Sequence, residues 1–314
     1  MPDEKTGRLD EELVVQMKGI TKVYPNGVAA NQGVDFNLRK GEIHALMGEN
    51  GAGKSTLMKM LFGLEQPTSG EIWVNGEKLN LSSPSVAISH GIGMVHQHFM
   101  LVPSLTVAEN MVLGMVPKKG LFIDHAKAVE ITKEYAERFN LHVEPEAKVV
   151  DIPVGMKQKV EILKALVRGA KILILDEPTA GLDPNERIRF RNLISELSQD
   201  RLVLLSTHIV SDIEYIANQV LLMKDGKISH SGTQEEIIQS VPVKVWSCVV
   251  ANNEVEMWQK QFKVSNMKTL SDGIELRILS EKCPHYNAKE ETMALEDIFL
   301  YYFGEKTGDD YDVL

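Results

Sequence analysis

Gly48-Glu49-Asn50-Gly51-Ala52-Gly53-Lys54-Ser55-Thr56 is the stretch that decides the fold of this chain. It follows an apolar run at residues 42–47, which predicts a short buried strand, and precedes an apolar run at 57–64, which predicts a helix. This context matches the P-loop pattern. We expect its backbone N–H groups and the helix N-terminus to surround nucleotide phosphates, Lys54 to bridge the β- and γ-oxygens, and Ser55 to ligate Mg²⁺.

A second pair of candidate residues ends another apolar run. Asp176 and Glu177 follow Ile-Leu-Ile-Leu at residues 172–175, which predicts a buried strand beside the P-loop. Nucleotide hydrolysis needs an acidic partner for the metal and a base for the attacking water. We expect Asp176 to orient Mg²⁺, directly or through water, and Glu177 to polarise the water. The plain alternative is a polar loop start, but the P-loop requires a carboxylate-bearing strand of this kind.

The composition indicates a globular protein. The 314 residues are 43% hydrophobic and 25% charged, which suits one large domain or two modest ones. Acidic residues outnumber basic ones by 44 to 34, and a net charge of -10 repels a phosphate backbone, so we expect no nucleic-acid partner. Cys248 and Cys283 have no metal-ligand spacing. No window approaches the roughly 20 apolar residues that span a bilayer, so we expect a soluble, cytoplasmic chain.

Strand and helix patterns predict three parts. A polar leader at residues 1–12 precedes a domain at 13–240, in which strand and helix signals alternate as in an α/β core. Helical signals dominate from about residue 82 to 169, where Asp124 suits the N-cap of a helix, and this predicts a helical insertion. Residues 241–314 predict a small α/β module with an acidic tail. Within the main domain we expect a helix at 184–197, a strand at 202–206, a hairpin of 220–223 with 227–229, and a closing helix at 233–239.

With these motifs the sequence resembles the ATP-binding cassette (ABC) ATPases across residues 13–240. The resemblance implies a P-loop NTPase fold whose mixed sheet core carries an antiparallel β subdomain and a helical insertion. It also implies roles for four further residues. Gln97, in Met-Val-His-Gln, contacts the metal and the water, and His208 hydrogen-bonds the γ-phosphate. Asp183, in Ala-Gly-Leu-Asp, belongs to the D-loop, and Tyr24 stacks on adenine.

The sequence departs from this family at the signature motif. Ile152-Pro153-Val154-Gly155-Met156 stands where the family has Leu-Ser-Gly-Gly-Gln, which reaches across a dimer to the partner's γ-phosphate. Gly155 keeps its place and its N–H group, whereas Pro153 has neither a hydroxyl nor a backbone N–H. One lost hydrogen bond to a charged phosphate costs about 1.5 to 3 kcal/mol. We therefore expect weaker ATP-driven dimer closure than the full motif provides.

Different parts of the sequence resemble two different branches of the family. Residues 13–180, with Gly-Met-Val-His-Gln-His-Phe-Met-Leu-Val-Pro at 93–103 and Pro-Val-Gly-Met at the signature, look like ATPases of nucleoside and simple-sugar importers of the basic membrane protein type. Residues 181–314, with Leu-Asp-Pro, Ser-Thr-His-Ile-Val-Ser-Asp and Leu-Glu-Asp-Ile-Phe-Leu, look like ABC-2-type exporter ATPases. The resemblances meet near residues 176–180. Recombination there and redundancy between related families both remain open.

The resemblance implies a transporter subunit that binds and hydrolyses ATP and couples dimer closure to substrate movement. We expect ATP and Mg²⁺ as cofactors. The expected partners are transmembrane permease subunits and a second ABC ATPase subunit, in a homo- or heterodimer, at the cytoplasmic face of the cell membrane. Nucleoside or simple-sugar import is the leading function. The alternatives are ABC-2-type export of a drug, peptide or lipid, a soluble ABC protein acting on DNA or the ribosome, and a cassette that only binds nucleotide.

Overall fold

The computed structural model describes residues 13–115, 118–119 and 122–304. The chain separates into two compact units, with the boundary between Ser229 and His230. The predicted leader at residues 1–12 and the last ten residues of the predicted acidic tail lie outside the described residues. No helix in the described ranges has both the length and the apolar character that crossing a bilayer requires.

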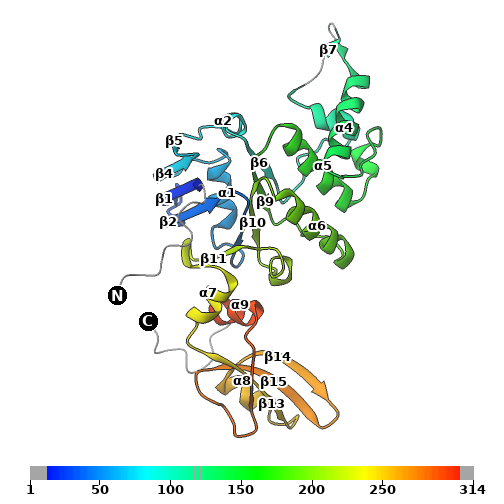
Figure 1. The fold of residues 1–314 in the computed structure, drawn as a ribbon. Helices are drawn as coiled ribbons and strands as arrows, with labels where there is room; N and C mark the ends of the chain where they lie inside the picture. The colour runs from blue at the N-terminus through cyan, green and yellow to red at the C-terminus, as the bar shows by residue number, and fades with distance from the viewer. Residues whose placement is uncertain (1–12, 116–117, 120–121, 305–314) are drawn as a thin grey trace, which may run out of the picture. The chain divides into compact units, whose positions relative to one another are not determined.

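A six-stranded sheet forms the centre of the first unit (Figure 1). Its strands are β3 (Ile43–Met47), β6 (Ile92–Val95), β9 (Ile172–Asp176), β10 (Leu202–Thr207), β11 (Gln219–Lys224) and β12 (Lys227–Gly232). They lie in the order β12-β11-β3-β10-β9-β6, and the five strands from β11 to β6 are parallel. Parallel strands are covered on both faces, and therefore β3, β9 and β10 consist entirely of buried residues.

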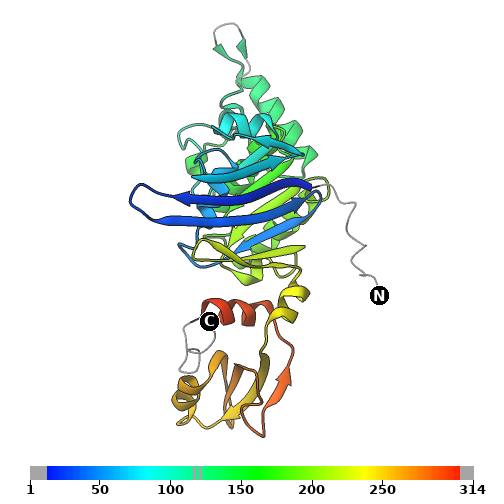
Figure 2. The same cartoon turned by 90° about the vertical axis from the view of Figure 1, so that its left-hand side faces the viewer.

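An antiparallel sheet lies beside this centre. Its strands are β1 (Leu13–Val23), β2 (Ala29–Arg39), β4 (Ser69–Val74) and β5 (Glu77–Leu79), in the order β2-β1-β4-β5. Figure 2 shows β1 and β2 as a long pair of neighbouring strands. One hydrophobic core joins both sheets to helix α1 (Lys54–Leu61), and it contains Leu38 of β2, Leu57 of α1 and Ile174 of β9. This shared core fixes the start of α1, and with it the P-loop, against the parallel sheet.

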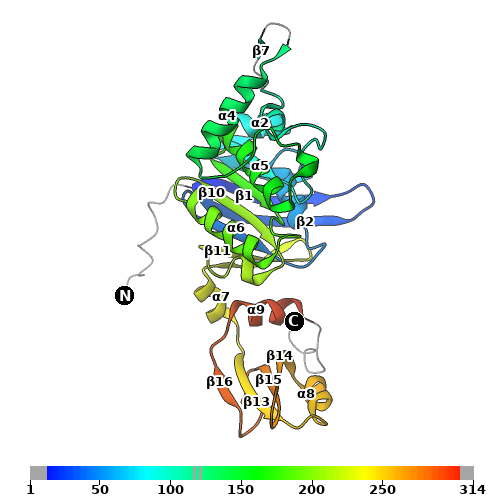
Figure 3. The same ribbon diagram turned by 90° about the vertical axis from the view of Figure 1, so that its right-hand side faces the viewer.

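Helices form the part of the first unit between β6 and β9 (Figure 3). Asp124 caps α4 (His125–Arg138) by accepting the Lys127 N–H at 3.0 Å, as the sequence predicted. Strand β6, however, falls inside the predicted helical insertion at residues 82–169 and pairs with β9 in the core sheet. Four buried residues are too few to give a strand signal. The α-helices and strands between β6 and β9 are α3 (Val107–Val112), β7 (Lys118–Lys119), β8 (Phe122–Ile123), α4 and α5 (Val154–Val167). Helix α2 (Pro84–Ser89) precedes β6, and α6 (Pro184–Leu197) follows β9.

The second unit is built on its own four-stranded antiparallel sheet. Its elements are α7 (Gln234–Ser240), β13 (Lys244–Val250), α8 (Val255–Gln261), β14 (Lys263–Leu270), β15 (Gly273–Ser280), β16 (Lys289–Glu291) and α9 (Leu295–Phe303). The strands lie in the order β14-β15-β13-β16. Trp258 of α8 packs on Leu276 and Ile278 of β15. Helix α7, which the sequence assigned to the end of the main domain, contacts α9 and so belongs to this second unit.

Candidate active site

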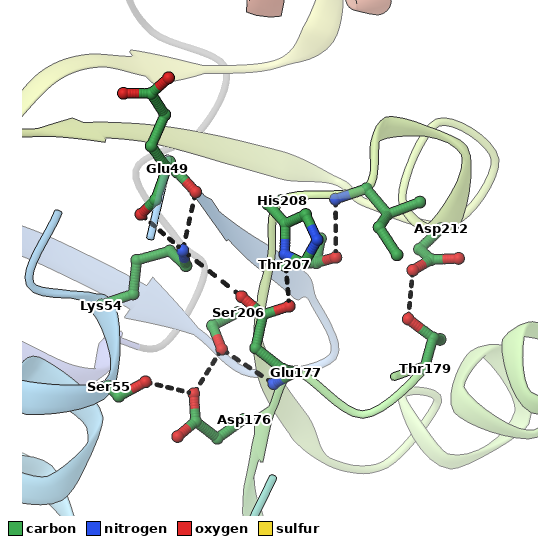
Figure 4. Close-up of polar contacts among 12 residues, drawn as sticks. Glu49, Lys54, Ser55, Asp176, Glu177, Thr179, Ser206, Thr207, His208 and Asp212 are labelled. Atoms are coloured by element: carbon green, nitrogen blue, oxygen red, sulfur yellow. Dashed lines mark hydrogen bonds and ion pairs between the residues drawn. The ribbon is translucent and has the colours of Figure 1, made fainter. Parts of the chain in front are cut away.

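The P-loop folds around its own lysine. Lys54 is buried, and its Nζ atom donates hydrogen bonds to the carbonyl oxygens of Gly48 at 2.7 Å and Glu49 at 3.0 Å (Figure 4). Gly53 has a φ of 102°, and a Cβ atom there would overlap the carbonyl oxygen of Ala30. Only glycine fits this position. Because α1 begins at Lys54, the free N–H groups of its first turn lie at the loop.

Asp176 lies at the carboxyl end of β9 and contacts the P-loop. The Ser55 hydroxyl donates to its Oδ1 atom at 3.0 Å. The hydroxyl of Ser206, which the sheet register places opposite Asp176, donates to the same oxygen at 2.7 Å. These two bonds fix the carboxylate beside the loop, where the sequence predicted it.

Glu177 has a backbone conformation that few side-chain-bearing residues adopt. Its φ is 47°, in the left-handed region, which costs an L-residue about 1 to 2 kcal/mol. The strain is held in place by Ser206, because the Glu177 N–H donates to its hydroxyl at 3.0 Å and to its carbonyl at 3.2 Å. In this position the Glu177 carboxylate lies 3.4 Å from Lys54 Nζ and 2.9 Å from His208 Nδ1. Strain of this kind concentrates at functional sites.

Gln97 and Tyr24 follow strands that lie next to β9 and to the P-loop helix α1. Gln97 is exposed two residues beyond β6, the strand that pairs with β9. Tyr24 directly follows β1, and its hydroxyl lies 3.3 Å from Thr56 Oγ1 at the first turn of α1. Asn50 and Gly51 are exposed, whereas Ala52 is buried beneath the loop.

Gly155 and Asp183 form a separate group. Neither contacts the P-loop or the carboxylates of Asp176 and Glu177 in the part of the chain that the structure describes. Asp183 caps α6 by accepting the Glu186 N–H at 2.8 Å. The Glu186 carboxylate in turn covers Gly155 on the first turn of α5, where a Cβ atom would overlap it. Glu186 thus links the two residues to each other.

Several titratable side chains line a hollow of about 160 Å³ that begins next to Gln97. Burial lowers the pKa of His96 and raises the pKa of Glu161. Burial likewise lowers the pKa of Lys164, whose Nζ atom donates to the Met100 carbonyl at 3.1 Å. In each case desolvation favours the neutral form of the group.

The oxygen atoms of Ser55 and Asp176 are donors of the kind that Mg²⁺ prefers. Magnesium in nucleotide sites is held by one or two protein oxygens together with phosphates and waters, so a dedicated cluster of ligands is not needed. Among the described residues, no group of three or more His, Cys, Asp and Glu side chains could hold a metal ion. A hydroxyl and a carboxylate held 3.0 Å apart beside the P-loop fit Mg²⁺ bound with nucleotide.

Sequence reasoning missed Ser206. This residue is fully buried and contacts both acids of the site. A signal was present, since Ser206 and Thr207 are the only polar residues of the otherwise apolar strand β10. Its importance becomes visible only with the strand register, which aligns Ser206 with Asp176.

Residues 31–180 match the family described as "ABC transporter". The chain is 50% identical over 217 residues to the guanosine import ATP-binding protein NupO of Bacillus subtilis (strain 168), an alignment that covers 69% of this chain and 42% of that protein. It is 48% identical over 217 residues to the nucleoside import ATP-binding protein NupA of Lactococcus lactis subsp. cremoris (strain MG1363), with 69% and 43% covered. The chain thus spans about half the length of the curated relatives it matches.

A solved structure has the same fold. The dimeric structure of MJ0796, a bacterial ABC transporter cassette, aligns with a TM-score of 0.61 at 27% identity, covering 70% of this chain and 98% of that one. The alignment confirms the predicted fold class, in which a P-loop cassette combines a parallel core, an antiparallel sheet and a helical part. The family match and the relatives show that this chain contains an ABC transporter ATPase domain, as its sequence motifs predicted.

Proposed function

We propose that this chain binds ATP with Mg²⁺ and hydrolyses the nucleotide. The observation that carries this proposal is the convergence of Lys54, Ser55, Asp176, Glu177 and His208 through contacts between 2.9 and 3.4 Å. These residues come from the P-loop and from the ends of two neighbouring strands. Phosphoryl transfer depends mainly on positioning and charge, and such a group supplies both.

Each residue has a role that its contacts support. The P-loop N–H groups and the Lys54 ammonium bind the phosphates. In this structure, the ammonium donates to the carbonyl oxygens of Gly48 and Glu49. Ser55 and Asp176 hold Mg²⁺, which when bound neutralises phosphate charge. For Gln97 we propose the contact with the metal and the water that the family resemblance implies. Glu177 accepts a proton from the attacking water. His208 has a side chain that is 46% exposed and can therefore reach the γ-phosphate.

The proposal includes a second cassette. Gly155 and Asp183 lie apart from the P-loop of their own chain, so their family roles require a partner chain. MJ0796 forms a dimer of this kind of cassette. We infer a pair, homo- or heterodimeric, in which two ATP molecules are held between Lys54 of one chain and Gly155 of the other.

The complete transporter is proposed to import nucleosides or simple sugars. The support comes from the identity of 50% with a guanosine import protein and 48% with a nucleoside import protein. Transmembrane permease subunits would bind beside Gln97 and the adjoining hollow, and would hold the chain at the cytoplasmic face of the membrane. The resemblance of residues 181–314 to ABC-2-type exporters stays a prediction.

Phosphate release by the purified chain tests the enzymatic part. We expect Mg²⁺-dependent hydrolysis of ATP, no turnover but retained binding in Glu177→Gln, and loss of binding in Lys54→Ala. Glu130→Gln is the matched control, because Glu130 is an exposed acid that pairs with Lys127 on α4. Full activity in Glu177→Gln would overturn its assignment as the base. Failure of the unaltered chain to bind ATP would overturn the proposed ATP binding and hydrolysis.

Co-purification of the tagged chain from its host membrane tests the transport part. A permease of the ten-helix type, encoded beside a lipoprotein-type binding protein, is the expected partner of an importer. Recovery of a six-helix ABC-2-type subunit would instead establish export and contradict the proposed direction.

A further inference from the structure

The hydroxyl of Tyr24 is held by the helix that begins at the P-loop. It lies 2.9 and 2.8 Å from the two carboxylate oxygens of Glu65, which follows α1, and 3.3 Å from Thr56 Oγ1 in the first turn of that helix. The single phenol proton is taken by the carboxylate, so the Thr56 hydroxyl donates to the Tyr24 oxygen. The far end of the ring is therefore fixed from two sides.

Lys22 completes the arrangement. Its Nζ atom donates to the Gln66 carbonyl at 2.7 Å and lies 3.5 Å from Glu65 Oε2. The same ammonium lies over the Tyr24 ring, 5.3 Å from its centroid, within the range of a cation–π contact. Glu65 thus holds both the hydroxyl of the ring and the cation that covers one of its faces.

The protonation of Tyr24 keeps this arrangement intact at neutral pH. Burial raises the pKa of Tyr24, the hydrogen bond from Thr56 works in the opposite direction, and the Glu65 carboxylate adds to the rise. The phenol therefore stays a donor toward Glu65 over the whole neutral range. The ring remains tethered under the conditions in which the protein binds nucleotide.

We propose that Glu65 is a positioning residue for the base of a purine nucleoside triphosphate. The inference rests on the proposed function and on the family resemblance, which implies that Tyr24 stacks on adenine. A side chain that rotates freely loses entropy when a ligand immobilises it. The Tyr24 ring has already lost that freedom through its bonds to Glu65 and Thr56. Glu65 therefore strengthens binding only of those ligands that carry a base.

Two ligands separate this effect from damage to the phosphate site. Titration calorimetry on the full chain would compare ATP with inorganic tripolyphosphate, each with Mg²⁺. In Glu65→Gln we expect the affinity for ATP to fall about three- to tenfold, with the affinity for tripolyphosphate unchanged. Glu71→Gln is the matched control, since Glu71 also accepts from an aromatic residue, Trp73, at 3.0 Å and pairs with Lys78, but lies on β4. This control should bind both ligands like the unaltered chain.

Tyr24→Phe provides a second route, because it keeps the ring and removes the hydroxyl. It should show the same loss for ATP alone, and adding Glu65→Gln to it should cause no further loss. Equal losses for both ligands, or additive losses in the double variant, would overturn the inference. If the unaltered chain bound both ligands and Glu65→Gln bound ATP as tightly as the unaltered chain does, only this inference would be wrong. If the unaltered chain bound neither, the proposed function would fall as well.

Discussion

The Ser206 hydroxyl donates a hydrogen bond of 2.7 Å to Oδ1 of Asp176. The same hydroxyl accepts the N–H group of Glu177 at 3.0 Å. One fully buried side chain thus orients the carboxylate proposed for Mg²⁺ and fixes the backbone of the residue proposed as the base. The two acids depend on a neighbouring strand for their positions.

Replacing this serine should affect both acids. In Ser206→Ala we expect the free energy of unfolding to fall by about 1 to 3 kcal/mol, because two buried polar groups lose a partner. We also expect the Mg²⁺ concentration for half-maximal ATP hydrolysis to rise. Ser198→Ala is the control, since the Ser198 hydroxyl donates only to the Ser195 carbonyl of its own helix at 2.9 Å. An unchanged Mg²⁺ requirement would show that Ser206 does not orient Asp176.

The altered signature motif should weaken ATP-driven dimerisation. Pro153 is the N-cap residue of α5 and makes no side-chain capping bond there, whereas the serine of the family motif supplies a hydroxyl and an N–H group. The test uses the Glu177→Gln chain, into which Pro153→Ser and Val154→Gly are introduced together. We expect the association constant of the ATP-dependent dimer to rise about ten- to a hundredfold, which corresponds to one hydrogen bond to a charged phosphate. Sedimentation with and without ATP measures this. No increase would contradict the prediction.

Gly155 should tolerate a methyl group only if Glu186 moves. A Cβ atom at Gly155 would overlap the Glu186 carboxylate, so Gly155→Ala should lower the free energy of unfolding by about 1 kcal/mol. The contact is with the end of a flexible side chain, and Glu186→Ala should therefore restore most of the loss in the double variant. Denaturant unfolding of both single variants and the double variant checks this. Additive losses would mean that the methyl group clashes elsewhere.

Stability of the second unit should depend on Asp297 at low pH. Burial raises the pKa of this carboxyl, but bonds from Arg277, the Ala294 N–H and Ser265 outweigh burial, and the pKa lies below its ordinary value of 3.8. Folding therefore favours the carboxylate. The contribution of Asp297 to the free energy of unfolding is fully present at neutral pH. It is lost as the pH falls below 3.8 and then through the lowered pKa of the folded chain.

Unfolding of Asp297→Asn at two pH values tests this dependence. At pH 7 we expect a loss of about 3 kcal/mol, because the substitution leaves Arg277 without its buried partner. At a pH below the lowered pKa of Asp297 the difference from the unaltered chain should shrink. Glu256→Gln, which breaks the exposed pair with Lys260, is the control and should have little effect at either pH. A difference that is independent of pH would exclude the ionised form as the source of stability.

Strong local signals were enough to predict many elements. The helix predicted at 184–197 is α6, because Asp183 supplies a cap and Pro184 suits the first turn. The hairpin of β11 and β12 turns at Asp225 and Gly226, which both have positive φ, as an Asp-Gly turn requires. Strand β14 carries a weak strand signal, because most of its residues are polar and it lies at a sheet edge, where half of them are exposed.

The sequence by itself determined the family, the fold class and the chemistry offered by Lys54, Ser55 and Asp176. These features depend on residue types at short spacings along the chain, and the sequence gives both directly. Only the tertiary structure decided that Ser206 holds the two acids, that Glu177 adopts a positive φ and that Glu65 fixes Tyr24. Those relationships join residues up to 41 positions apart through strand register and helix packing, which the folded chain alone brings together.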